Sequence, residues 1–125
     1  MQELASGWTI ETERGPDWLF VRLHAPDDFR ITDDEIANEL WSLLEEHFTY
    51  RLVLELDDLS VLQSNIIGQL VTLYKRINAH EGLLRICGLS RKCQEVLNVS
   101  QLESCLPQYR SREEAVMGAR PGRPK

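Results

Sequence analysis

The sequence contains no long apolar segment. A helix that crosses a bilayer needs about 20 consecutive apolar residues, and no stretch of the 125 residues approaches that length. The first seven residues, MQELASG, carry an acid where a signal peptide has a basic residue, and no apolar stretch follows them. We therefore predict a cytoplasmic protein that does not insert into a membrane.

Cysteine and histidine are both scarce, with three of each. The cysteines are odd in number and no C-x-x-C pair occurs, so reduced thiols packed in the fold are expected rather than disulfides. The histidines lack the spacing of zinc ligands, so no metal site is expected. The residues concerned are Cys87, Cys93, Cys105, His24, His47 and His80.

Motifs of catalysis and nucleotide binding are also missing. The chain has neither the phosphate loop GxxxxGK(S/T) nor the nucleophile elbow G-x-S-x-G. No histidine stands next to Ser64 in the sequence as an evident general base. The sequence therefore predicts a protein that is not an enzyme and that needs no cofactor.

Basic residues are in the minority, 14 against 20 acidic ones, which gives a net charge of −6. Residues 119–125 hold three of the basic residues and no acid, so residues 1–118 carry 11 against 20, or −9. This charge argues against nucleic acid as a partner and favours a protein that presents a basic face. We expect one domain over residues 1–118 and a mobile basic tail over residues 119–125.

Hydrophobic periodicity predicts an α/β domain with a mixed sheet of four to five strands packed against about four helices. The first two strands are separated by a short turn, so they should form an N-terminal β-hairpin in which Trp8 and Trp18 pack. The expected strands are residues 8–13, 18–23, 51–56, 83–87 and 108–109, and the expected helices are residues 32–47, 64–77, 91–97 and 111–117.

Three helix boundaries carry recognisable end signals. Thr32 to Glu35 and Ser111 to Glu114 have the form of capping boxes. Gly82 follows the long helix and is a natural C-cap. The buried stripe of the first helix is expected to comprise Ile36, Leu40, Leu43, Leu44 and Phe48.

The stretch from residue 51 to residue 76 organises the chain. A buried strand leads into a loop, and the loop leads into a helix whose first turn contains Ser64. In open α/β sheets, partners and ligands tend to bind at this end of a strand. Ser64 could act as a helix cap, or as a phosphoacceptor at the positive end of the helix dipole. Asp57 and Asp58 are interpreted as a solvated turn rather than a magnesium site.

These residues resemble the signature of STAS domains, the anti-sigma factor antagonist family. In that family an aliphatic strand ends in an acid and a small loop, and Asp-Ser-Ser-Gly-Leu-Gly opens the following helix. Glu55 stands at the acidic position, Leu56 and Leu59 at apolar ones, Ser64 at the phosphorylatable serine and Gly68 at the last glycine. The resemblance extends over roughly residues 8–117.

The resemblance implies a single STAS-like domain that binds an anti-sigma factor, which in this family is also a serine kinase, and so releases a sigma factor. It implies that Ser64 is the phosphoacceptor and that phosphorylation breaks the complex. The implied docking face lies around the loop after the second strand and the start of the long helix. Its residues are Asp27, Asp28, Phe29, Asp58, Gln63, Asn65, Ile66 and Ile67.

Three positions depart from the family pattern, because Gln63, Asn65 and Ile66 replace the usual Asp, a small hydroxyl residue and a glycine. Alternatives therefore stay open. The domain could be a STAS scaffold that is not phosphorylated, or the STAS subunit of a lipid-transport ABC complex. A small-ligand or nucleotide-binding module is a third reading, and it requires a partly apolar pocket beside Ser64.

Overall fold

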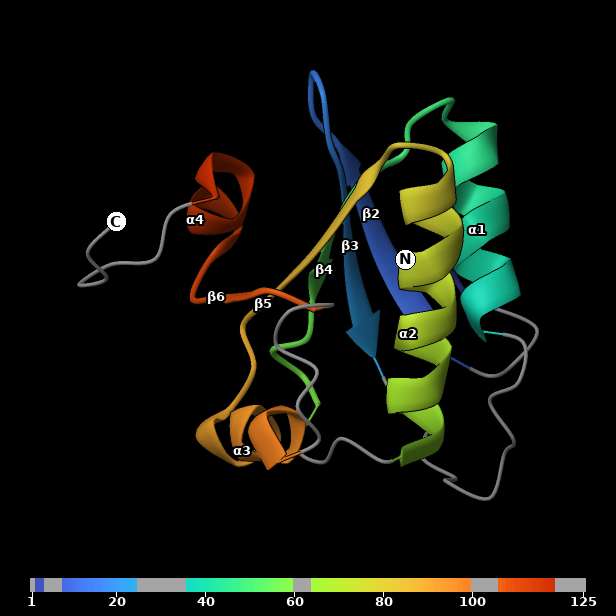
Figure 1. Ribbon diagram of the computed structural model, residues 1–125. Coiled ribbons are helices and arrows are strands. Elements are labelled where there is room, and N and C mark those ends of the chain that lie inside the picture. Colours follow the sequence, from blue (N-terminus) through green and yellow to red (C-terminus); the bar gives the residue numbers. More distant parts are fainter. Residues whose placement is uncertain (1, 4–7, 25–35, 60–63, 100–105, 119–125) are drawn as a thin grey trace.

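The computed structural model describes residues 2–3, 8–24, 36–59, 64–99 and 106–118. They form one mixed sheet in the order β1-β2-β3-β4-β5-β6, with four helices around it (Figure 1). β1 to β3 are antiparallel neighbours, and β3 to β6 run parallel. The strands are β1 (Gln2–Glu3), β2 (Thr9–Arg14), β3 (Leu19–His24), β4 (Arg51–Glu55), β5 (Leu83–Cys87) and β6 (Gln108–Tyr109), and the helices are α1 (Ile36–Glu46), α2 (Ser64–Ala79), α3 (Arg91–Val99) and α4 (Arg112–Met117).

The predicted fold class is confirmed, including the hairpin and its turn. The Gly15 N–H donates to the Trp18 carbonyl at 2.8 Å, and Arg14 pairs with Leu19 as the last pair before the turn. The two-residue strand β1 was not predicted, because Gln2 and Glu3 have no apolar pattern and are set only by their pairing with β2. Thr32 to Glu35, where the first capping box is expected, lie outside the described residues.

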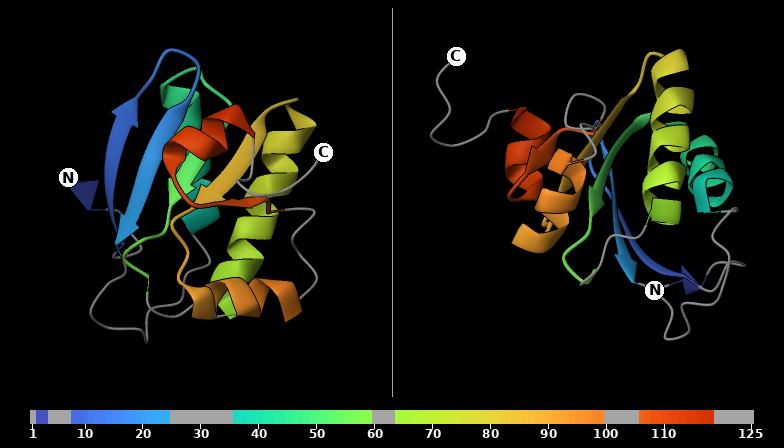
Figure 2. Two further views of the ribbon diagram at one scale, coloured as in Figure 1. Left: turned by 90° about the vertical axis from the view of Figure 1, so that its left-hand side faces the viewer. Right: turned by 60° about the horizontal axis from the view of Figure 1, so that its bottom comes forward.

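Helices α1 and α2 cover one face of the sheet (Figures 1 and 2). Strand β3 shows why the core lies there, since Leu19, Val21 and Leu23 are at most 1% exposed and alternate with partly exposed residues. The two helices are joined by hydrogen bonds as well as by apolar packing. The Ala37 N–H donates to Gln69 Oε1 at 2.9 Å. Among the described helices, none is long and apolar enough to span a bilayer.

Helix α4 packs on the opposite face, over β4, β5 and β6 (Figure 2). Its predicted N-cap is confirmed, because Ser111 Oγ accepts from the Glu114 N–H at 3.3 Å. The Glu114 carboxylate reaches back to the Arg110 N–H, one residue before the cap, at 3.2 Å. At the other end of the helix, Arg85 Nη1 donates to the Ala115 carbonyl at 2.7 Å. Helix α4 is therefore capped at its start and hydrogen-bonded to β5 at its end.

Trp8 and Trp18 are both buried, as expected, but on different sides of the sheet. Trp8 belongs to the main core under α1 and α2. Trp18 belongs to a smaller cluster with Val53 and Ala115 under α4. The hairpin thus contributes one tryptophan to each of the two hydrophobic layers.

The prediction that Phe48 joins the buried stripe of α1 is wrong, because its side chain is 87% exposed. The chain leaves α1 through a left-handed turn, with φ of 52° at Phe48. The Phe48 N–H donates to the Glu45 carbonyl at 3.2 Å, and the Thr49 N–H donates to the Leu44 carbonyl at 3.1 Å. This pattern is a Schellman motif, which rotates the ring away from the helical stripe.

The end of α2 has the same motif one residue earlier than the sequence predicted. Glu81, not Gly82, takes the left-handed conformation, with φ of 59°. The Glu81 N–H donates to Asn78 and the Gly82 N–H donates to Ile77. Gly82 is required for a different reason, since a Cβ at this position would collide with the Tyr50 carbonyl oxygen and with Ile77.

We expect Gly82→Ala to destabilise the fold by at least about 1–3 kcal/mol, because the added methyl group overlaps backbone. The matched control is Gly68→Ala, within α2, where a Cβ meets no atom within 4 Å. That change should stabilise the protein by about 0.5–1 kcal/mol, because alanine is the better helix former. Urea unfolding of both variants checks this, and similar effects of the two changes would contradict the account.

Candidate functional site

The candidate site lies where the parallel strands β3, β4 and β5 end. The strand register aligns Arg22, Glu55 and Cys87 across the three strands. The chain then leaves β4 through an exposed turn at Asp57 and Asp58 and enters α2 at Ser64, as the sequence predicts. The positive end of the α2 dipole therefore lies toward the carboxyl ends of the parallel strands, where β4 finishes.

The structure describes only part of the expected docking face. Ser64 and Asn65 lie in the first turn of α2, but their side chains are outside the description. The residues wholly outside the described ranges are Asp27, Asp28, Phe29 and Gln63. The position of the α2 start is therefore known from its backbone.

The remaining three expected residues divide between surface and core. The Asp58 side chain is 46% exposed. Ile66 and Ile67 are only 5% and 8% exposed and pack with Leu70 in the main core. Their side chains therefore anchor the first turn of α2, and any contact they make with a partner is limited to this small exposed area.

An ion-pair cluster around one buried carboxylate joins the elements around the site. Glu55 is 4% exposed, the one buried charged residue in the described part of the chain. Arg22 Nη2 donates to Glu55 Oε1 at 2.9 Å, and Arg112 Nη2 donates to Glu55 Oε2 at 2.5 Å. Arg112 Nη1 also pairs with Glu13 Oε1 at 2.8 Å. One carboxylate thereby links β3, β4 and α4, and Arg112 extends the link to β2.

The titration behaviour of the two guanidinium groups follows from these contacts. The hydrogen bond to Glu55 raises the pKa of Arg22 above its ordinary value. Burial lowers the pKa of Arg112, but its hydrogen bonds to Glu13 and Glu55 outweigh this effect, so that the pKa is raised overall. Both groups therefore stay cationic at any physiological pH, and the cluster holds its charges.

His24 forms a second polar link at the end of β3. Its Nε2 faces a carboxylate oxygen of Glu11 on β2, and its Nδ1 faces a carboxylate oxygen of Asp58 in the turn after β4. The imidazole is 23% exposed. Asp58 is therefore held toward the hairpin rather than free in the solvent.

The turn after β4 is also held against the loop after β5. The Leu56 N–H donates to the Cys87 carbonyl at 2.9 Å. Gly88 has φ of 79°, and a Cβ there would overlap the carboxylate of Asp57. Burial raises the pKa of the Cys87 thiol to about 12, and the charges of Glu55 and Asp57 add to this effect. Cys87 is therefore an unreactive core thiol.

Sequence reasoning missed Arg22, Arg112 and His24 as members of the site. Alternation along β3 does place Arg22 and His24 on the face away from the main core, but their partners depend on strand register. Arg112 lies 57 residues from Glu55 in the sequence. No local pattern predicts a pair at that separation.

The polar side chains of the site contact one another. Both nitrogens of His24 face carboxylates, not a hydroxyl or thiol that they could activate. The part of the chain that the structure describes contains no group of three His, Cys, Asp or Glu side chains able to hold a metal ion. What the site offers is charge and hydrogen-bonding capacity at a surface.

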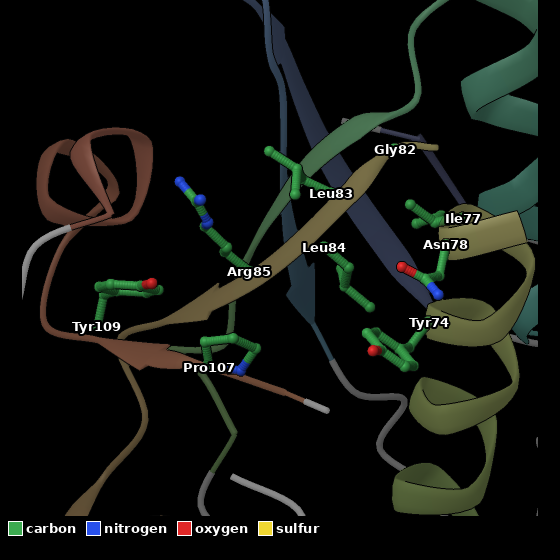
Figure 3. A pocket seen from close by; sticks show the side chains of 9 residues that line it. All are labelled: Tyr74, Ile77, Asn78, Gly82, Leu83, Leu84, Arg85, Pro107 and Tyr109. Carbon is green, nitrogen blue, oxygen red and sulfur yellow. The ribbon is translucent and has the colours of Figure 1, made fainter. Parts of the chain in front are cut away.

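A partly apolar cavity of about 230 Å³ lies elsewhere, beside the outer side of β5 (Figure 3). It is lined by residues that include Tyr74, Asn78, Leu84 and Tyr109. Tyr74 is ten residues beyond Ser64 in α2, about 15 Å along the helix axis. The cavity is therefore not the pocket beside Ser64 that a small-ligand module requires.

Comparison with known proteins identifies relatives over most of the chain. A family model of the STAS domain matches residues 9–115. The anti-sigma F factor antagonist of Paenibacillus polymyxa is 27% identical over 100 residues, which are 80% of this chain and 85% of that protein.

Solved structures share the fold at low sequence identity. An anti-sigma factor antagonist from Mycobacterium paratuberculosis matches with a TM-score of 0.73 and 15% identity, over 93% of this chain and 97% of that chain. The unphosphorylated form of the anti-sigma factor antagonist SpoIIAA matches with 0.67 and 16%, over 89% and 98%. The phosphorylated form of SpoIIAA, a Bacillus cell fate determinant, matches with 0.63 and 17%, over 90% and 100%.

We expect Glu55→Gln to lower the free energy of unfolding by about 2–3 kcal/mol. Removing one partner from a buried ion pair costs about 3–5 kcal/mol. Arg22 and Arg112 are 37% and 28% exposed, so water should compensate part of that cost. The control is Glu46→Gln on the exposed side of α1, with an effect within about 0.5 kcal/mol. Equal losses in urea unfolding would show that the pairing of Glu55 is unimportant.

We expect stability to fall as the pH rises above about 8.5, because of Cys87. A thiol in the unfolded chain ionises near pH 8.5, whereas in the folded state Cys87 stays protonated up to about pH 12. Between these values only the unfolded state loses the proton, so unfolding becomes easier. Between pH 8.5 and pH 10 the wild type should lose about 1.6 kcal/mol more than Cys87→Ala. Parallel pH profiles under reducing conditions would contradict this.

Proposed function

Because the chain belongs to the STAS domain family, we propose that it is a regulatory protein that works by binding another protein, as an anti-sigma factor antagonist. Relatives in sequence and in fold bear that description. The proposed partner is an anti-sigma factor that is also a serine kinase, and the proposed setting is the cytoplasm. The role is that of a non-enzymatic binding domain.

The observation that carries the proposal is the start of α2 at Ser64, directly after the loop that follows β4. This position combines the positive end of a helix with the end of a parallel strand, where partners of α/β proteins tend to bind. The first turn of α2 contains no acid that already compensates the helix dipole. A group with negative charge can therefore be accommodated at this end without loss of the fold.

We assign Ser64 the role of phosphoacceptor. A phosphate would add about −1.5 to −2 charges beside the backbone N–H groups of the first turn. The buried side chains of Ile66 and Ile67 anchor that turn, so the change would act on the surface rather than on the core. The added anion would lie on the same side of the domain as the exposed turn at Asp57 and Asp58. A partner docked over this surface would be expelled while the domain stays folded.

The proposed docking face combines the α2 start with the turn after β4 and the loop after β3. Within it, Asp58 offers an exposed carboxylate, and Ile66 and Ile67 act as anchors. The other members are Asp27, Asp28, Phe29, Gln63 and Asn65. The net charge of −6 favours a partner that presents basic residues to this face.

One observation favours a second candidate, a docking domain that is never phosphorylated. Ile66 stands where the family pattern has a glycine, and its side chain is buried. Backbone freedom at the start of α2 is therefore smaller than a glycine would allow. A kinase that must reshape this turn around Ser64 would find it more rigid.

Co-purification from the native cell, followed by intact-mass analysis, separates these possibilities. We expect wild-type protein to be recovered with a kinase-like partner and to carry one phosphate that Ser64→Ala lacks. Ser64→Asp should keep its thermal unfolding midpoint but lose the partner.

The matched control is Ser90→Ala, since Ser90 also caps a helix and accepts from the Cys93 N–H at 3.2 Å. It should keep the phosphate and the partner. A stable partner with no phosphate on any form would leave the constitutive docking domain. Permease and ATPase partners would indicate a lipid-transport subunit, and absence of any protein partner would refute the proposal.

A further inference from the structure

In the described part of the chain, no helix is centred over β2 and β3 on the face of the sheet opposite the main core. Helices α1 and α2 lie on the main-core side, and α4 packs on the other side mainly over β4, β5 and β6 (Figure 2). Over the remaining part, formed by β2 and β3, the side chain of Arg112 reaches Phe20 and Glu13, and the side chain of Asp58 reaches His24. We call this surface, formed by Glu11, Glu13, Arg22 and His24, the β2–β3 face.

The β2–β3 face is concave. A cleft of about 440 Å³ runs along β2 and β3 to Asp58, and a second cleft of about 410 Å³ continues from it toward the start of α4. Glu13, Arg22 and Arg112 line both clefts. The two clefts therefore lie next to each other between the open strands and α4, with the ion pair of Glu13 and Arg112 in the wall that they share, and together they are called the groove.

The groove is acidic. Six carboxylates and three guanidinium groups line the two clefts, a net charge of −3 with His24 neutral. Arg22 and Arg112 both pair with the buried carboxylate of Glu55, whose negative charge compensates part of their positive charge. Glu11 pairs with His24 and Glu13 pairs with Arg112, but both carboxylates remain 49% and 68% exposed on the rim, so the surface that a partner meets keeps a net negative charge.

The acids of β2 also have a defined spacing. Glu11 and Glu13 are alternate residues of the same strand, so their side chains point to the same side about 7 Å apart. An extended segment with lysine or arginine at alternate positions has the same repeat. Asp58 would meet the end of such a segment that lies toward the carboxyl end of β3.

We propose that the β2–β3 face binds an extended basic segment of a partner protein, whose alternate lysine or arginine side chains pair with Glu11, Glu13 and Asp58. The proposal goes beyond the proposed function and needs no phosphorylation of Ser64. It adds a second docking surface, which adjoins the first at Asp58. A partner that spans both surfaces would be held by two independent sets of contacts.

The test is an NMR titration of the full chain, labelled with ¹⁵N, with a synthetic peptide in which lysine alternates with threonine. A peptide of the same composition with its lysines adjacent controls for the spacing. We expect the alternating peptide to bind more tightly and to shift the amide signals of β2, β3 and Asp58. Binding should weaken as salt is added.

Paired variants test whether the acids of β2 are responsible. Glu11→Gln with Glu13→Gln should weaken the alternating peptide about fivefold or more, from two lost exposed ion pairs. Glu45→Gln with Glu46→Gln removes the same charge from exposed positions on α1 and should change the affinity less than about twofold. Ser64→Ala should bind as the wild type does, which separates this surface from the proposed phosphoswitch. Equal losses in both double variants, equal affinity for both peptides, shifts confined to other surfaces, or no binding would each overturn the proposal.

Discussion

The carboxylate of Glu55 is the point on which the rest of the site depends. A charge buried at the end of a strand is unfavourable unless it is paired and hydrogen-bonded. Here Arg22 and Arg112 occupy its two oxygens. Because these arginines come from β3 and from α4, satisfying one carboxylate fixes the positions of three elements. The ion pair therefore ties the positions of β3, β4 and α4 to one another.

This arrangement determines what a partner can meet. The turn at Asp57 and Asp58 is held between His24 on one side and the tight approach of Gly88 on the other. Buried Ile66 fixes the first turn of α2 from below. A chemical change at the start of α2 should therefore alter the charge and shape of the surface without altering the fold. A domain that switches partners by changing its surface charge requires a surface that can change while the fold stays the same.

Local patterns were sufficient to predict most of the fold. The apolar strand of residues 18–23, the helical spacing after Ser64 and the N-cap at Ser111 each depend on neighbours in the sequence, and each is confirmed. The exposed ring of Phe48 and the left-handed Glu81 could not be predicted in this way. They depend on how a helix must end to reach the next strand, and glycine is only the commonest solution.

The candidate site was less predictable than the fold. Ser64 and the turn after β4 could be found from the strand-loop-helix pattern, but the partners of Glu55 could not. Arg22 reaches Glu55 only through the parallel register of β3 and β4, and Arg112 reaches it from the far end of the chain. Long-range pairs of this kind are set by topology, which a single sequence does not display.

The central claim is that phosphorylation of Ser64 releases a bound protein from an intact domain. The most direct measurement is the affinity of the purified partner, by calorimetry, for homogeneous protein with and without phosphoserine at position 64. The account predicts that the phosphate weakens binding by at least about 100-fold, equivalent to about 2.7 kcal/mol, and leaves the unfolding midpoint within a few degrees. Equal affinity for both forms, or loss of the folded state with the phosphate, would contradict it.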